Sequence, residues 1–158
     1  MRKKIKDKVD KVKQSLFDIK DNADFSIELG NILKIYDSDI DNMQNLASMC
    51  YSKKVLALCM MLEDCGQADT ILEFFDEYPN YIDETIGALE EIGAPKSAEI
   101  IRKAKKILPT NGLSFFDVAD DVMWKSMKEL DSEFSRYPDG PTDILYRKYA
   151  EKHKEDFI

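Results

Sequence analysis

The strongest constraint on the fold is a pair of amphipathic segments that are joined by only three residues, Gly93-Ala94-Pro95. On both sides of this break, apolar residues recur every three or four positions, which is the spacing of one face of an α-helix. Gly93 suits the position just after a helix, and Pro95 suits the first turn of the next one. Because so short a connection joins antiparallel neighbours, the sequence predicts a tight αα-hairpin. The residues expected to face inward are Ile82, Ile86, Leu89, Ile92, Ala98, Ile101, Ala104, Ile107 and Leu108.

The same spacing covers most of the chain and predicts an all-α fold of about eight helices. The helices are expected over about residues 3–21, 24–36, 40–50, 53–63, 68–78, 80–92, 95–108, 114–135 and from 142 onward. No run of alternating β-branched residues predicts a strand. No linker is long enough to separate a second domain. Residues 1–158 are therefore predicted to form a single compact domain.

Polar residues and glycines indicate where these helices begin and end. Asp24, Ser52, Asn80 and Ser114 have side chains that commonly cap the first turn of a helix. Gly66 is expected to end the helix that starts near residue 53.

Charge is divided unevenly along the chain. The net charge is +5 over residues 1–20, −13 over residues 21–95 and zero over residues 96–158, which gives −8 in all. Residues 55–95 contain ten carboxylates and no Lys, Arg or His. Soluble helices usually interleave Glu with Lys, so this stretch is expected to leave its charge unneutralised and to suit a positively charged partner. Its sign argues against direct binding of nucleic acid.

The basic segment 1–21 is predicted to be an amphipathic helix that docks on the body through a narrow apolar stripe. The alternative is a basic arm that contacts a membrane or nucleic acid. No apolar run follows the segment and none elsewhere reaches the length of a membrane span, so neither secretion nor membrane insertion is expected. The three cysteines, Cys50, Cys59 and Cys65, form no CxxC pair, which favours a cytoplasmic protein with free, buried and inert thiols.

No catalytic or cofactor motif is present, so the chain is predicted not to be an enzyme and to need no cofactor. The single histidine, His153, reads as a surface residue. Adjacent acids such as Glu63-Asp64 could serve as acid–base pairs or as ligands for a hard cation. Neighbours on a helix diverge by about 100°, however, so solvated carboxylates are the expectation and no metal site is predicted.

Three acidic doublets follow one another at seven-residue spacing, at positions 76, 83 and 90. The last two share one helix and lie opposite its apolar face, with Gly87 between them. Spacing along such a face is comparable to that of phosphates along a DNA strand. The predicted protein-binding residues are Asp69, Glu73, Asp76, Glu77, Asp83, Glu84, Glu90 and Glu91.

From residue 74 onward the chain has a set of aromatic, turn and helix-end residues: Phe74-Phe75, Tyr78-Pro79-Asn80-Tyr81, Ala88-Leu89, Ile92-Gly93-Ala94, Leu130, Phe134, Tyr149 and Phe157. With these residues, the sequence over about residues 63–158 resembles the bacterial DNA-mimic-protein family. The chain has Ala68-Asp69-Thr70-Ile71 where family members usually have Asn-Gly-Gly-Phe. The resemblance implies an acidic protein that occupies the DNA-binding face of a transcription regulator.

The leading hypothesis is therefore a non-enzymatic acidic module that binds a basic protein, such as a DNA-binding regulator. An immunity or antitoxin protein that neutralises a basic nuclease toxin is the alternative, because the same electrostatics would serve it. A carboxylate-dependent enzyme is a third reading, which would require convergent acids in a cleft. The sequence also leaves a homodimer open.

Overall fold

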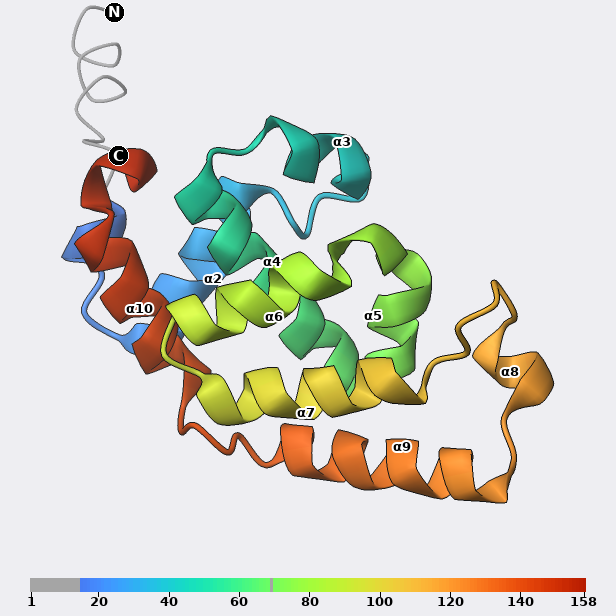
Figure 1. The fold of residues 1–158 in the computed structure, drawn as a ribbon. Helices are drawn as coiled ribbons and strands as arrows, with labels where there is room; N and C mark the ends of the chain where they lie inside the picture. The colour runs from blue at the N-terminus through green and yellow to red at the C-terminus, as the bar shows by residue number, and fades with distance from the viewer. Residues whose placement is uncertain (1–14, 69) are drawn as a thin grey trace, which may run out of the picture.

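A computed structural model describes residues 15–68 and 70–158. Within them the chain forms nine α-helices, three short 3-10 helices and no β-strand (Figure 1), which confirms the predicted all-α fold. The α-helices are α2 (Asn22–Leu33), α3 (Asn42–Ser48), α4 (Tyr51–Ala68), α5 (Ile71–Glu77), α6 (Ile82–Glu91), α7 (Pro95–Ile107), α8 (Phe115–Val118), α9 (Asp121–Ser135) and α10 (Thr142–Lys152). The 3-10 helices are η1 (Leu16–Asp18), η2 (Pro79–Tyr81) and η3 (Lys154–Phe157).

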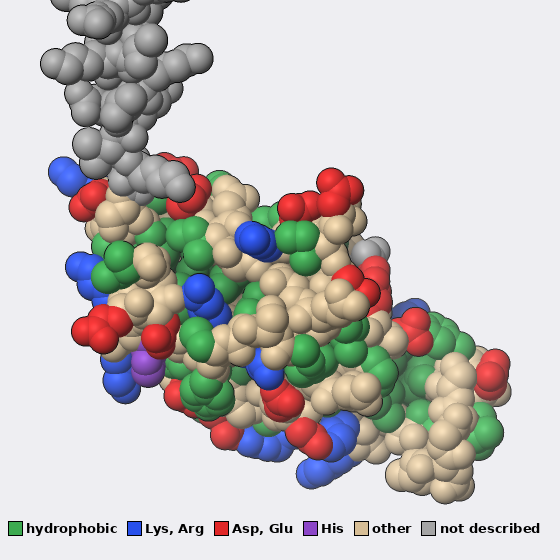
Figure 2. All heavy atoms as spheres, turned by 90° about the horizontal axis from the view of Figure 1, so that it is seen from above, with side chains coloured by type: hydrophobic (Ala, Val, Ile, Leu, Met, Phe, Trp, Pro, Cys, Tyr) green, Lys and Arg blue, Asp and Glu red, His purple; other side chains and the backbone are tan. Residues whose placement is uncertain are grey.

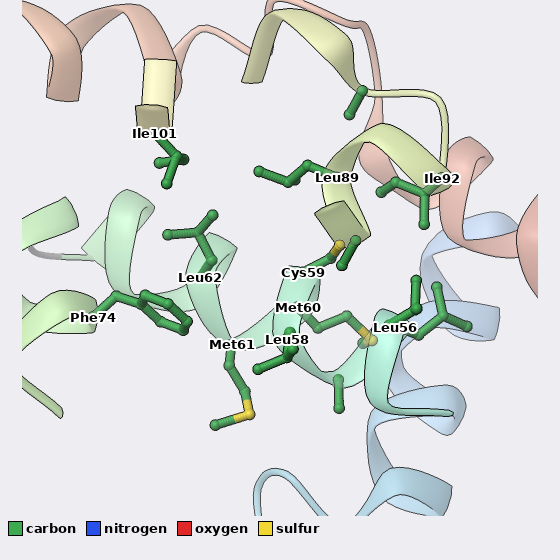
Figure 3. Packing of buried hydrophobic residues seen from close by; sticks show 14 of the residues in the cluster. Leu56, Leu58, Cys59, Met60, Met61, Leu62, Phe74, Leu89, Ile92 and Ile101 are labelled. Carbon is green, nitrogen blue, oxygen red and sulfur yellow. The ribbon is translucent and has the colours of Figure 1, made fainter. Parts of the chain in front are cut away.

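Helix α4 is the centre of the molecule. Every residue from Val55 to Leu62 is buried, as expected of a helix that is apolar on all sides and enclosed by others. It packs against α2, α5, α6 and α9. Figure 3 shows Phe74 of α5, Leu89 of α6 and Ile101 of α7 around its side chains. The first part of the cation-free stretch therefore belongs to the core.

Helices α6 and α7 form the predicted antiparallel hairpin and lie side by side (Figure 1). The amides of Gly93 and Ala94 donate to the carbonyls of Glu90 (3.1 Å) and Leu89 (2.8 Å). This pair of bonds closes the end of α6 and requires a left-handed residue, which Gly93 supplies with φ of 89°. Pro95 begins α7, as predicted.

Two carboxylates from the C-terminal third bind the starts of distant helices. Asp139 accepts hydrogen bonds from the backbone amides of Lys96 (Oδ1, 3.0 Å) and Ser97 (Oδ2, 2.8 Å), at the start of α7. Asp131 accepts one from the amide of Ile71 (2.9 Å), at the start of α5. Negative charge is favourable at a helix N-terminus because the first amides have no partner within the helix. These contacts fasten α9 and the loop after it to the rest of the fold.

The N-terminal helix predicted over residues 3–21 does not continue to residue 21. Of this segment, only Ser15 onward is described, and the rest of the prediction lies outside the described residues. Leu16–Asp18 form the short helix η1, and Ile19 after it is extended. Leu16 is buried in the core, and the ring of Phe17 lies 5.8 Å from that of Phe25 in α2.

Three predicted N-terminal caps, Asp24, Ser52 and Asn80, are also wrong, because each helix begins at a neighbouring position. Asp21 caps α2 by accepting a hydrogen bond from the amide of Asp24, the residue that was expected to cap it. Helix α4 begins at Tyr51 rather than after Ser52. A 3-10 turn precedes α6, so Asn80 does not cap it.

The long helix predicted over residues 114–135 is divided into α8 and α9. Ala119 is extended, with φ of −66° and ψ of 127°, and ends α8. Asp120 then caps α9 by accepting a hydrogen bond from the amide of Met123 at 2.8 Å. The break places α8 beyond the end of α7, at the side of the molecule away from α10 (Figure 1).

Gly66 does not end α4 as predicted but lies inside it, where a Cβ atom would come within 2.5 Å of the buried Phe134 ring of α9. We expect Gly66→Ala to lower the free energy of unfolding by about 1–2 kcal/mol, because the ring and the helix must move apart. Gly87→Ala is the matched control, since a Cβ atom there meets nothing, and it should stabilise by about 0.5–1 kcal/mol. Chemical denaturation measures both variants. Equal stability of the two would contradict the close contact of α4 with α9.

Candidate functional site

The predicted acidic face lies on α5 and α6, and Asp69 lies outside the described residues. Asp76 and Glu77 are exposed at the end of α5, and Glu84 is exposed in the first turn of α6. None of these three takes part in an ion pair among the described residues. Glu73 is only half exposed. The open negative charge of this face is therefore concentrated around the junction of α5 and α6.

The remaining acids of α6 have partners, and the expectation that this stretch stays unneutralised is wrong for Asp83 and Glu90, which meet cations of α7. Asp83 forms an ion pair with Lys105 of α7, and Glu90 forms one with Arg102. Glu91 accepts a hydrogen bond from the hydroxyl of Tyr51. Figure 2, which shows one face of the molecule, likewise has carboxylates interspersed with cations and apolar side chains.

A second group of acids gathers where α4 meets α10 and the loop before it. Glu63 of α4 accepts hydrogen bonds from three hydroxyls: those of Tyr137 (3.1 Å), Thr142 (2.9 Å) and Tyr146 (2.5 Å). The Tyr146 side chain is buried, and burial raises its pKa well above the usual value, with the charge of Glu63 adding to the effect. Glu63 thus ties the central helix to the C-terminal part of the chain.

Beside Glu63 lies a hollow of about 230 Å³ between α2, α4 and α10, which we call the acidic hollow. Its lining includes Ser26, Ile27, Tyr36, Glu63, Asp64 and Asp143. It contains three carboxylates, and no Lys or Arg is among its described lining residues. Glu63 and Asp64 thus both line one hollow, although they are adjacent on the helix and were expected to diverge.

The electrostatics of the hollow show concentrated negative charge. Burial first, and the charge of Glu63 second, raise the pKa of Asp64 to about 6, while a hydrogen bond with the Tyr36 hydroxyl opposes the rise. Burial followed by the charges of Asp64 and Glu63 raises the pKa of Tyr36 to about 12. Both shifts therefore reflect burial in the first place and the neighbouring carboxylates in the second.

This arrangement suits recognition of a cation better than acid–base catalysis. Three donors already occupy the oxygens of Glu63, which leaves it a structural acceptor rather than a free base. The hollow is also smaller than the roughly 300–1,000 Å³ of typical small-molecule sites. No group of three or more His, Cys, Asp or Glu side chains in the described parts of the chain is arranged to hold a metal ion.

Sequence reasoning missed the acidic hollow. In the sequence, only the doublet Glu63-Asp64 at the end of an apolar run indicated where the hollow lies. No sequence pattern connects this doublet with Asp143, which lies on α10, far along the chain. The hydroxyl donors come from the loop and helix around Tyr137 and Tyr146, which were assigned no role.

The cysteines and the histidine form no reactive cluster with these acids. Cys59 is buried, and burial raises the pKa of its thiol. Cys50 is exposed, so the prediction that it is buried is wrong. His153 stacks on Tyr149 with a ring separation of 4.4 Å. Among the described helices, none combines the length and the hydropathy that crossing a bilayer requires.

Asp64→Asn tests the charge of the hollow. Because the pKa of Asp64 is raised in the folded state above its usual value of about 3.9, the folded protein binds this proton more tightly and loses stability as pH rises from about 4 to 6. Asparagine removes that loss. We expect the variant to be more stable than wild type by about 1 kcal/mol at pH 7, after allowance for solvent screening, and equally stable below about pH 4. Thermal unfolding across this pH range would contradict the expectation if the difference were independent of pH.

One comparison with known proteins gave a match. The family model described as DMP19-like protein matches residues 49–153, two thirds of the chain. The match begins earlier than the resemblance over residues 63–158 and takes in the whole of α4. No curated protein and no solved structure matches this chain.

Proposed function

Because this chain belongs to the DMP19-like protein family, we propose that it is a non-enzymatic acidic module that covers the DNA-binding face of a regulator. The family is a DNA-mimic family and implies a partner that normally binds DNA.

The main support from the structure is a group of exposed carboxylates, those of Asp76, Glu77 and Glu84, that have no counter-ion among the described residues. They lie in the region of the chain with a net charge of −13. Carboxylates presented to a basic surface take the place of phosphates, because Arg and Lys bind both groups through charge-assisted hydrogen bonds. Such binding is fast and sensitive to salt.

The ion pairs between α6 and α7 are compatible with this role. Their side chains are substantially exposed, with 78% of Asp83 and 48% of Glu90 accessible. Exposed pairs contribute only about 0–1 kcal/mol. A basic partner could therefore exchange them for its own cations at small cost, while the three open acids supply the initial attraction.

Displacement of DNA tests the proposal. The protein would be immobilised at low salt, its partner captured from the native cell, and the purified partner bound to its labelled DNA. We expect the protein to displace the DNA, and the effect to weaken steeply as salt rises. Simultaneous binding of DNA and protein to the partner would contradict the proposal, as would a captured nuclease whose active site is blocked, which would indicate an immunity protein.

Charge reversal then tests the surface. The triple variant with Lys at positions 76, 77 and 84 should lose displacement. The matched control carries Lys at three other exposed acids, Asp117, Glu129 and Glu133, and therefore has the same net charge. Equal loss in both variants would show that overall charge, rather than this face, governs binding.

A further inference from the structure

We propose that the acidic hollow receives an arginine side chain of the basic partner and so fixes how the partner is seated. This inference rests on the proposed function and deepens it, because it names a specific contact in addition to the acidic face of α5 and α6. The hollow lies between α2, α4 and α10, and none of the predicted protein-binding residues is among its described lining residues.

The carboxylates that line the acidic hollow have no counter-ion among the described residues. Glu63, Asp64 and Asp143 line the hollow, and none of the four ion pairs in the described residues involves any of them. By contrast, α6 meets its own cations from α7. Like charges held together without a counter-ion raise the free energy of the empty site, so a partner's cation is stabilised there more than on an open surface.

A buried hydroxyl at the acidic hollow, that of Ser26, also has no hydrogen-bond partner among the described residues. Ser26 of α2 lines the hollow and is only 8% exposed, yet its hydroxyl makes no hydrogen bond among the described residues. A buried hydroxyl is normally paired, because leaving it unpaired is unfavourable by about 1–3 kcal/mol. A guanidinium has five N–H donors, so a donor remains for this hydroxyl after the carboxylates are bound.

The rim and the size of the hollow suit a single arginine side chain. Tyr36 and Ile27, at its edge, are 53% and 60% exposed, so their apolar surfaces are accessible to a side chain that enters the hollow. Planar guanidinium groups stack on tyrosine rings, and their aliphatic stems pack on apolar neighbours. A volume of about 230 Å³ accommodates one long side chain rather than a drug-sized molecule. Arginine meets these conditions better than lysine, whose ammonium cannot bind in a planar, forked geometry.

The protein's own nearby arginines are engaged elsewhere. Arg147 donates to Glu151 at 3.0 Å and lies over the ring of Phe25. Arg136 donates to Ser132 at 3.0 Å and lines a neighbouring cavity. Neither lines the acidic hollow, so no arginine in the described part of the chain occupies it.

A labelled tetra-arginine peptide probes the hollow directly, by fluorescence anisotropy on the full chain at low salt. Asp64→Asn and Asp143→Asn are each expected to weaken binding at least about tenfold, because each removes a charge-assisted contact. The matched controls, Asp117→Asn and Glu129→Gln, each remove one charge from an exposed residue outside the hollow and outside the acidic face, and should change binding less than about twofold. A tetra-lysine peptide should bind more weakly than tetra-arginine. Thermal unfolding verifies that every variant is folded.

The inference is overturned if the peptide does not bind, if the control variants lose as much as the hollow variants, or if tetra-lysine binds equally well. DNA displacement separates this failure from that of the proposed function. If Asp64→Asn and Asp143→Asn displace DNA as well as wild type does, only the arginine contact is wrong. If wild type displaces no DNA, the proposed function is wrong, whatever the peptide shows.

Discussion

Replacing Glu63 by alanine is expected to lower the free energy of unfolding by about 2–3 kcal/mol. The carboxylate accepts three hydroxyl hydrogen bonds, and its loss would leave the Tyr146 hydroxyl, on a side chain only 2% exposed, without an acceptor. Orphaning a buried donor costs about 1–3 kcal/mol, and bonds to charged groups are the stronger kind. Relief of repulsion from Asp64 offsets part of the loss.

Urea denaturation followed by circular dichroism measures this effect. Glu63→Gln retains the shape and one acceptor oxygen, so it should lose only about 1 kcal/mol. Glu84→Ala is the matched control, because it removes an exposed glutamate without an ion pair and should change stability by less than about 0.5 kcal/mol. If Glu63→Ala behaved like Glu84→Ala, Glu63 would not be the acceptor that joins α4 to α10.

Asp139→Ala is expected to lower the free energy of unfolding by about 2 kcal/mol. Its two carboxylate oxygens accept from the amides of Lys96 and Ser97, and α7 has no capping side chain of its own. Loss of a helix cap costs about 0.5–2 kcal/mol, and here the same change also frees the loop between α9 and α10 from the hairpin.

Hydrogen exchange distinguishes this cap from a general loss of stability. The amides of Lys96 and Ser97 should exchange faster in Asp139→Ala than the other amides of α7. Asp117→Ala, which removes an exposed acid from the first turn of α8, is the control and should leave α7 unchanged. Uniform acceleration along α7 would mean that Asp139 does not act at its N-terminus.

The hairpin and the core helix could be predicted because their signals are local. Gly93 and Pro95 mark a turn that few other residues permit, and the run from Val55 to Leu62 is too apolar to be exposed. Helix starts were predicted less well, because neighbouring residues compete to cap the same turn. Asp21 caps α2, where the sequence pattern predicted Asp24. Asp120 caps α9 at a position that was predicted to lie inside a longer helix.

The ion pairs of α6 were missed because the cation-free stretch ends at Pro95, immediately before the basic helix that folds back over it. Asp83 pairs with Lys105, and these two lie eleven residues on either side of Ala94. Glu90 pairs with Arg102, and these two lie four residues before and eight residues after it. The predicted hairpin therefore implied them, since antiparallel helices bring such positions together. The acidic hollow had no comparable signal, because it depends on how α2 and α10 pack across α4, which no local pattern specifies.

The position of α2 has a consequence for how the protein can be divided. The family match covers residues 49–153, whereas α2 lies outside it, with Phe25 and Leu29 fully buried against the rest of the fold. Helix α2 covers both α4 and α10. A fragment trimmed to the family boundaries would uncover an apolar surface and open one wall of the hollow, and such surfaces promote aggregation. The part of the chain that matches the family is therefore shorter than the part that packs around one core.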